Sequence, residues 1–203
     1  MRVIHIIPSA FEYFTDIRSQ AFQLIEGLYA MGVDTEAFTV QYGYPDKGMK
    51  AEVQKDSPSV HTYMGSTGQQ GLIDHLSNFD IVHLHAPFLG AAKQIIEWKK
   101  AHPDKSLIIT VHRDVPWTDF FSLFVKLYNH FYLPKLFARA DLIIADNLKK
   151  LQSFRASAYI GADNHVAILD EIELDKLKKK HELNESELVA AKTVLLYNSL
   201  VSQ

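Results

Sequence analysis

Cysteine is absent from the 203-residue sequence, which excludes disulfide bonds and thiolate metal sites. Charge is nearly balanced, with a net charge of −3, so the basic face that nucleic acid requires is not expected. No apolar run is long enough for a transmembrane helix, and the run at 2–8 is too short for a signal peptide. We therefore expect a cytoplasmic protein without nucleic acid as a partner, and we leave peripheral contact with a membrane open.

Glycine is also missing from a place where nucleotide-binding folds often use it. None occurs between Met1 and Gly27, so no glycine after the first predicted strand lets backbone amides approach a phosphate. Thr15 and Asp16 stand there instead, and both are suitable helix caps. A carboxylate at Asp16 would repel a diphosphate unless a cation lay between them.

The sequence alternates short apolar runs with longer segments of helical period. Strands that alternate with helices of this length indicate an α/β fold with a Rossmann-like, doubly wound, mainly parallel sheet. Apolar runs predict strands at 2–8, 33–40, 59–64, 80–86, 106–112, 140–146, 156–161 and 165–169. Helices are predicted at 15–32, where Gly32 is the stop, at 88–102, at 117–139 with a break near Pro134, and at 172–183, with loops at 41–57 and 65–71.

The end of the sequence predicts a C-terminal appendage of helix and strand. We expect a single Rossmann-like domain over 1–170, followed over 171–203 by a linker helix and a terminal strand. The strand is predicted from the apolar run Val194–Tyr197. Left unpaired, this strand would be an exposed edge, which predicts that the chain forms a homo-oligomer.

Histidines mark the strand ends, where parallel sheets bind their ligands. His83 and His85 are two residues apart and share one face of a strand, so with His112 they would supply three imidazoles. No carboxylate or cysteine stands at a recognisable spacing, and the residues therefore predict no metal centre. We expect His83 to be buried and hydrogen-bonded, and His85 and His112 to lie closer to a ligand.

The densest polar cluster is "HRDVPWTD", which directly follows a predicted strand. His112 there is suited to act as a general base or to bind a sugar hydroxyl, and Arg113 to pair with a phosphate. The alternative is a loop in which Thr118 or Asp119 caps the next helix. The aromatic-rich segment that follows, 117–140, is typical of core packing, with an amphipathic membrane-surface helix as the alternative.

Five segments, taken in order, resemble one known domain. They are "RVIHIIPSAF", "AFQLIEGLYAMGVDTEAFTV", "DIVHLHAPF", "LIITVHRD" and "ADLIIAD". Together they resemble the N-terminal, acceptor-side domain of retaining glycosyltransferases with the GT-B fold, similar to glycosyltransferase family 4. Such enzymes use a nucleotide-sugar donor in polysaccharide or lipid-linked synthesis, and their second domain, which binds the donor, has no counterpart in this sequence.

The resemblance implies roles for particular residues. His112 takes the place of the cleft histidine near the transferred sugar and is the expected catalytic residue. Thr15 and Asp16 replace the glycine pair beside the donor diphosphate, a degenerate donor region, and no cofactor is implied. The expected residues for binding the acceptor or sugar are His85, Pro87, Arg113, Asp114 and Trp117.

Two functional hypotheses follow from this resemblance. The first is the acceptor-binding half of a hexosyltransferase, inactive alone, whose partners are a donor-domain subunit and a sugar or lipid-linked acceptor. The second is a non-catalytic binding or scaffold protein that retains the half-fold. A third, a nucleotide-binding Rossmann protein, rests on "GSTGQQG", which lacks the lysine of a phosphate loop.

Overall fold

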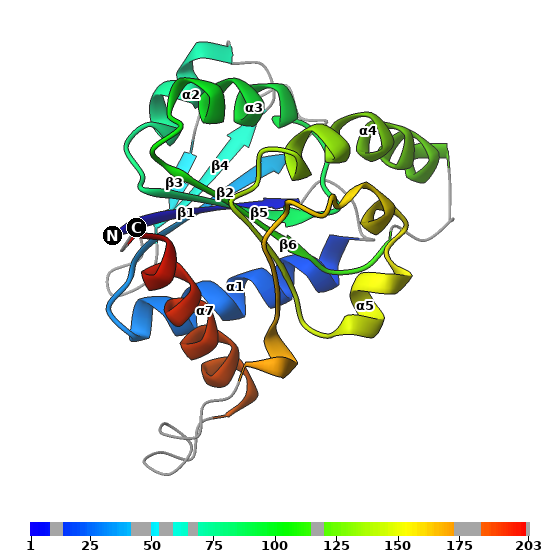
Figure 1. The fold of residues 1–203 in the computed structure, drawn as a ribbon. Helices are drawn as coiled ribbons and strands as arrows, with labels where there is room; N and C mark the ends of the chain where they lie inside the picture. The colour runs from blue at the N-terminus through cyan, green and yellow to red at the C-terminus, as the bar shows by residue number, and fades with distance from the viewer. Residues whose placement is uncertain are drawn as a thin grey trace.

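One sheet of eight strands organises the chain in the computed structural model (Figure 1). The structure describes residues 1–8, 14–41, 50–52, 59–64, 69–114, 120–172 and 184–201. The strand order is β3-β4-β2-β1-β5-β6-β7-β8, and all neighbours are parallel except the antiparallel pair β3 and β4. The strands are β1 (Arg2–Pro8), β2 (Asp34–Gln41), β3 (Lys50–Glu52), β4 (Ser59–Met64), β5 (Ile81–Ala86), β6 (Ser106–Val111), β7 (Leu142–Ala145) and β8 (Val166–Ile168).

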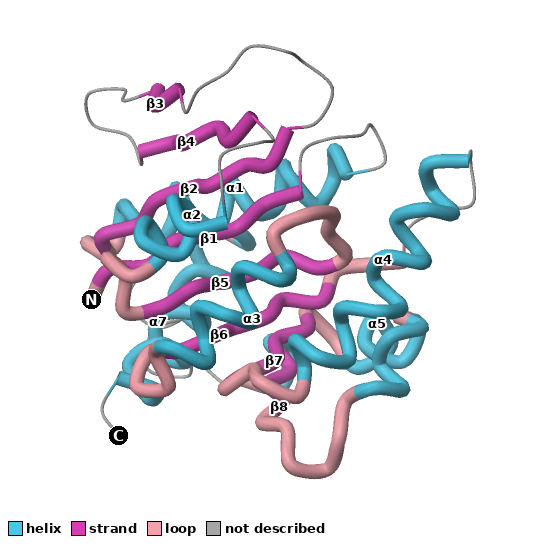
Figure 2. Tube along the Cα trace, turned by 90° about the horizontal axis from the view of Figure 1, so that it is seen from above, coloured by secondary structure: helices cyan, strands magenta, loops and turns pink. Residues whose placement is uncertain are grey.

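Helices cover both faces of this sheet, which confirms the doubly wound α/β fold predicted from the sequence. Helices α2, α3 and α4 lie on one face, and α1 and α7 lie on the other (Figure 1; Figure 2 shows the first face from above). The helices are α1 (Thr15–Ala30), α2 (Gln69–Leu76), α3 (Ala92–Ala101), α4 (Phe120–Phe137), α5 (Leu148–Ser153) and α7 (Glu185–Val201), with the 3-10 helices η2 (Arg155–Tyr159) and η3 (Leu169–Glu171).

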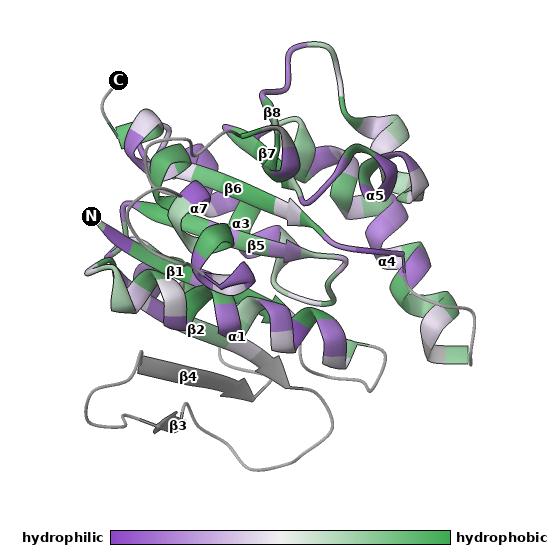
Figure 3. Ribbon diagram, turned by 90° about the horizontal axis from the view of Figure 1, so that it is seen from below, coloured by the Kyte–Doolittle hydropathy of each residue, from purple (hydrophilic) through white to green (hydrophobic). Residues whose placement is uncertain are grey.

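The central strands are buried because helices exclude water from both of their faces. Every residue of β5 and β7 is buried, as expected for parallel strands, and hydrophobic colour runs along most of β5 and β6 in Figure 3. Trp98 and Phe137 fill the core beneath α3 and α4. Leu28 and Tyr197 fill the second core, beneath α1 and α7.

Helix α1 begins and ends close to the predicted bounds. Gly32 follows its last turn with a φ of 82°, a backbone conformation that favours glycine and stops the helix. The N-cap residue is Phe14, which makes no side-chain capping bond, so the expected capping role of Thr15 is wrong. Asp16 lies in the first turn, where a carboxylate interacts favourably with the helix dipole.

The C-terminal segment is a helix, so the strand predicted at Val194–Tyr197 is wrong. Helix α7 buries Ala190, Thr193 and Tyr197, a spacing that places them on one helical face against the core. Asn184 precedes the helix, and its Oδ1 accepts a hydrogen bond from the Glu187 amide while the Glu187 carboxylate accepts one from the Asn184 amide. This reciprocal capping box fixes where α7 begins. The helix predicted at 172–183 lies almost wholly outside the described residues.

The structure also tests four smaller predictions. The strand predicted at 156–161 is wrong, because most of that segment forms η2, whereas the one at 165–169 is confirmed as β8. Helix α4 continues through Pro134, so the predicted break there is wrong. The loop predicted at 41–57 contains the short strand β3, and the rest of that loop is largely outside the described residues.

Helices α1 and α7 approach each other closely at a glycine. A Cβ atom added to Gly27 would lie 2.7 Å from the Cβ of Ala190, a distance that packed side chains do not tolerate. The absence of a side chain at Gly27 therefore lets α7 lie against α1 and cover the sheet.

Replacing Gly27 by alanine tests this contact. We expect Gly27→Ala to lower the free energy of unfolding by roughly 1–3 kcal/mol, because the added methyl group overpacks the helix interface. Gly71→Ala on α2 is the matched control, since nothing lies within 4 Å of its added Cβ, and it should stabilise the protein by up to about 1 kcal/mol. Urea unfolding measures both. A Gly27→Ala protein as stable as Gly71→Ala would disprove the close approach.

Candidate functional site

Four histidines from three neighbouring strands gather on the sheet face beneath α1 and α7. His5 lies beside His83 in the pairing of β1 with β5, and His85 lies beside Thr110 in the pairing of β5 with β6. His112 follows β6 two residues after Thr110. Alternate residues of a strand share a face, so this register directs all four imidazoles to the same side. All four are buried, and we call them the histidine chain.

Hydrogen bonds connect the rings of the histidine chain. His5 Nδ1 lies 3.1 Å from His85 Nε2, and His85 Nδ1 lies 2.9 Å from His112 Nε2. At the outer end, His112 Nδ1 lies 3.0 Å from Gln20 Oε1, on α1. Three of the four rings therefore form one line from the protein interior to Gln20.

The inner end of the chain is closed by a tyrosine of α7. The Tyr197 hydroxyl lies 2.5 Å from His83 Nδ1 and 3.5 Å from His5 Nε2. The other nitrogen of His83 lies 2.6 Å from Thr110 Oγ1. His83 is therefore buried and hydrogen-bonded, as the sequence predicted.

One arrangement of protons satisfies every one of these hydrogen bonds. The Gln20 oxygen can only accept, so His112 Nδ1–H donates to it, and the neutral ring then accepts at Nε2 from His85 Nδ1–H. His85 accepts in turn from His5 Nδ1–H. His5 then accepts at Nε2 from the Tyr197 hydroxyl, whose oxygen accepts from His83 Nδ1–H. Each of the four imidazoles therefore carries a single proton, on Nδ1. Gln20 thus sets the tautomer of the line.

Burial keeps the histidine chain neutral. Desolvation lowers the pKa of His5, His83 and His85 well below 6.5, and neighbouring histidines lower each of them further. For His112, desolvation lowers the pKa to about 4; Asp146 opposes this shift, and Lys150 adds to it. Burial also raises the pKa of the Tyr197 phenol. At neutral pH every member of the chain is therefore uncharged.

Metal binding is not what this geometry favours. Nitrogens of His5, His83 and His85 lie within 4.8 Å of one another, so His5, rather than His112, completes the set of three. The rings of His83 and His85 are nearly parallel, 14° apart with centroids at 4.7 Å, and their nitrogens already serve other hydrogen bonds. The cluster contains no carboxylate to offset a buried dication.

A pocket of about 780 Å³, lined by both polar and apolar side chains, opens beside the outer end of the chain, and we call it the polar pocket after the groups it offers a ligand. It lies at the carboxyl ends of β5, β6 and β7, between α1 and the first half of α7. His85, Thr110 and His112 form part of its buried lining, and Asp146 and Asp170 are among its more exposed lining residues. This is where a doubly wound sheet binds its ligand.

A buried lysine of α7 contributes to this pocket. Lys192 is only 8% exposed, and among the described residues its Nζ donates a hydrogen bond to the Leu169 carbonyl at 2.6 Å. An ammonium carries three donors, so further donors are available to a ligand. The second cation of the pocket, Lys150, is paired with Asp146. The pocket therefore combines hydrogen-bond donors and acceptors of both charges.

Sequence reasoning missed several residues of this site, among them His5, whose neighbours depend on strand register. Gln20 has no sequence signal, because it is one polar residue among many on α1. Tyr197 ends an apolar run that predicts a strand, and the sequence therefore gives no signal of its contact with the histidines. Lys192 carries a usable signal, since it is a single charge within the largely apolar stretch 188–197.

The structure separates the site residues that the sequence grouped together. His85 and His112 line the polar pocket, whereas Pro87 and Asp114 line a second pocket of about 380 Å³ on the opposite face, beneath α4. Trp117 lies outside the described residues. Arg113, expected to pair with a phosphate, instead forms an ion pair with Asp16 at 2.9 Å. Thr15, in the degenerate donor region, is exposed.

Acidification should destabilise this protein through the histidine chain. Because the folded pKa of His112 is about 4, below its unfolded value of 6.5, the unfolded chain binds more protons between these values. Stability is therefore present above pH 6.5 and lost as the pH falls toward 4. We expect a loss of roughly 2–4 kcal/mol between about pH 7 and pH 4.5, measured by urea unfolding.

His112→Gln should show a smaller loss on acidification, because it removes one titrating group. His165→Gln, at an exposed position, is the control and should follow the wild type. A wild-type stability that is constant or rises over this range would contradict the neutral histidine chain.

The tyrosine that closes the chain can be tested separately. Tyr197→Phe keeps the ring but removes the hydroxyl, leaving His83 Nδ1 buried without its partner. We expect the free energy of unfolding to fall by roughly 1–3 kcal/mol. Tyr29→Phe, on the exposed part of α1, should change it by less than about 0.5 kcal/mol. Equal effects of the two substitutions would mean that the hydroxyl has no structural role.

Comparison with known proteins gives a fold and no sequence relative. No protein-family model matches the sequence, and no curated protein is significantly similar to it. A sucrose-phosphate synthase structure from Thermosynechococcus elongatus is 13% identical, with a TM-score of 0.57 over 98% of this chain and 99% of its own. An apo structure of OtsA is 12% identical, with a TM-score of 0.47 over 95% of this chain and 55% of its own.

The likeness to sucrose-phosphate synthase spans nearly the whole of both chains, including the part of this chain that forms α7. An identity of 13% carries no information about substrate or residue roles. The match in structure, by contrast, confirms the predicted resemblance at the level of the fold. Over nearly its whole length, this chain has the same Rossmann-like fold as that sucrose-phosphate synthase structure.

Proposed function

We propose that this chain is the acceptor-binding half of a glycosyltransferase that moves a sugar from a nucleotide-sugar donor to a glycan or lipid-linked acceptor. The observation that carries the proposal is the polar pocket of about 780 Å³ at the carboxyl ends of β5, β6 and β7. It stands on a fold shared with sucrose-phosphate synthase. Its position and its mixed polar lining both suit a small hydroxyl-rich ligand.

The pocket offers complementary groups to sugar hydroxyls, which both donate and accept hydrogen bonds. Asp146 and Asp170 accept, while Lys192 donates from a largely buried position. His112 contributes its Nδ1–H, which Gln20 now occupies and which a ligand hydroxyl would take over. Its Nε2 already accepts from His85, so we assign His112 to holding the sugar as a donor, in place of a general base.

The pairing of positive side chains with carboxylates supports the proposal that the chain is inactive alone. A departing diphosphate needs preorganised positive charge. The guanidinium that follows β6, Arg113, is paired with Asp16, and Lys150 is paired with Asp146. We therefore propose that a separate donor-binding subunit supplies the groups that stabilise the diphosphate.

A second candidate function is a non-catalytic binding protein. The closed histidine chain favours it, since both ring nitrogens of His112 are occupied. In that case the same pocket binds a sugar, and no transfer follows when a donor-binding subunit is added.

Sugar binding can be measured directly through the His112 ring resonances. Glucose, mannose and their 1-phosphates are titrated by NMR, with UDP-glucose as the donor probe. We expect saturable shifts of His112 with the sugars, no tighter binding of UDP-glucose, and at least about tenfold weaker sugar binding in Lys192→Met, because a charged hydrogen-bond donor is lost. Lys149→Met, on the exposed side of α5, is the matched control.

Each outcome of this titration is informative. Absence of any sugar-dependent shift at His112 would overturn the proposed pocket. Tight binding of UDP-glucose that requires His112, or sugar transfer by the lone chain, would overturn the assignment as an inactive acceptor half. Product formed only after a donor-binding subunit is added would separate the enzyme from the binding protein.

A further inference from the structure

A stripe of large apolar side chains faces solvent along α4. Phe120, Phe124, Leu127 and Phe131 are 80%, 52%, 47% and 61% exposed. Their spacing of four, three and four residues places them on one face of the helix. We call these four residues the α4 stripe.

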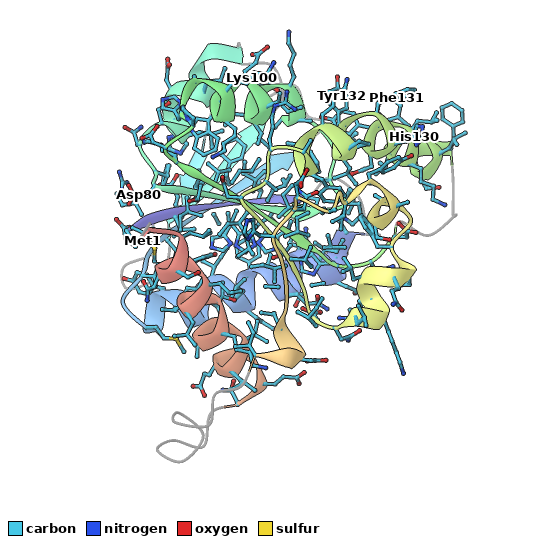
Figure 4. The ribbon with its side chains drawn as sticks, in the orientation of Figure 1. Met1, Asp80, Lys100, His130, Phe131 and Tyr132 are labelled. Carbon is cyan, nitrogen blue, oxygen red and sulfur yellow. The ribbon has the colours of Figure 1, made fainter. Side chains whose placement is uncertain are left out.

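The stripe is separate from the face by which α4 packs on the protein. Val125, Leu133 and Leu136 of the same helix are fully buried, and the Asn129 side chain bonds to the Phe88 backbone. The packing face is therefore already satisfied by the core. Helix α4 lies at the edge of the molecule in two perpendicular views (Figures 1 and 2), and the labelled residues His130, Phe131 and Tyr132 lie along this outer helix in Figure 4.

Among the described side chains, exposed apolar residues elsewhere do not form such a group. Most of the others, such as Tyr29 on α1, Leu148 on α5 and Leu195 on α7, are scattered over different elements. Isolated exposed apolar residues are common and need no explanation, whereas a contiguous exposed group marks an interaction surface. Among the described side chains, every phenylalanine classed as exposed belongs to the α4 stripe.

Positive charge accompanies the stripe. The sequence from 120 to 140 contains Lys126, Lys135 and Arg139 and no acidic residue, although the whole chain has a net charge of −3. Lys135 is exposed one turn beyond Phe131. Asp114 lies nearby, in the pocket beneath α4 that Lys126 also lines. Phenylalanines flanked by cations are what an amphipathic helix presents to anionic lipid.

We propose that the α4 stripe docks this protein on the surface of an anionic lipid membrane. The helix lies in the plane of the interface, with its phenylalanine rings among the acyl chains and its cations at the headgroups. Within the described part of the chain, no helix is long and apolar enough to cross a bilayer. The proposal does not rest on the proposed sugar transfer.

The pocket beneath α4 extends the apolar surface. It has a volume of about 380 Å³, and Leu123, Leu127 and Leu133 contribute to its lining. Leu127 therefore belongs both to the stripe and to the pocket. Apolar surface that continues from a helix face into a recess suits flexible acyl chains, which can fill an irregular shape.

Vesicle flotation tests the docking surface with the full chain. We expect the wild type to float with vesicles of phosphatidylcholine and phosphatidylglycerol and to remain behind with phosphatidylcholine alone. The triple variant Phe120→Ser, Phe124→Ser and Phe131→Ser should lower the partition coefficient at least about tenfold, because it removes the buried apolar area. Leu148→Ser, at a residue 48% exposed on α5, is the matched control and should bind like the wild type.

Charge is tested with a second pair of variants. Lys135→Glu should weaken binding about fivefold or more, whereas Lys100→Glu on α3 should have little effect. Raising the salt to about 0.5 M should weaken binding of the wild type.

Several results would overturn the proposal. They are equal binding by the triple variant and the wild type, no flotation of the folded wild type with anionic vesicles, or equal loss in the Leu148→Ser control. Sedimentation of the same proteins tests the alternative, in which the stripe is a contact between two copies of this chain. A wild-type dimer that the triple variant converts to a monomer, without vesicle binding by either, would assign the stripe to self-association instead. None of these results bears on sugar binding, so the two proposals fail separately.

Discussion

Four imidazoles buried on one face of a parallel sheet form the constraint on which this structure depends. With water excluded, each ring nitrogen needs a partner within the protein, and half of these nitrogens find it in another histidine. Each ring can then carry only one proton, which agrees with the lowered pKa values. Gln20 on α1 sets the direction of the line at its outer end, and Tyr197 on α7 completes it at the inner end. Strand register, helix position and protonation are therefore interdependent.

The same constraint limits the chemistry of the neighbouring pocket. A general base needs a free lone pair, and the lone pair of His112 is used by His85. Arg113 and Lys150, the positive groups that follow the strand ends, each have a carboxylate partner, whereas Lys192 of α7 keeps donors for a ligand. What remains available is hydrogen bonding to a polar ligand. A wall that binds and orients a polar ligand is what the proposed acceptor-binding half requires.

Much of the fold could be predicted because buried parallel strands are continuous apolar runs, and their carboxyl ends meet at one edge. That rule found His85 and His112, but it could not find His5, whose neighbours depend on strand register. The apolar run Val194–Tyr197 predicts a strand although it lies in α7, because four apolar residues fit a strand and a helix equally well. Its helical period emerges only when the buried Ala190 is included. Contacts between distant elements, such as α1 and α7, leave no periodic trace in the sequence.

The two candidate surfaces separate where β5 and β6 end, because beyond Ala86 and Val111 strand alternation no longer fixes which face a side chain takes. His85 and His112 line the polar pocket on the α1 and α7 face, whereas Pro87 and Asp114, two positions further along, line the pocket beneath α4. Both surfaces thus lie at one edge of the sheet, on opposite faces. Under the two proposals taken together, a lipid-linked acceptor whose tail stays in the membrane beside α4 would pass its head group around this edge to reach His112. The arrangement therefore favours acceptors with an extended polar head group over a single sugar attached directly to lipid.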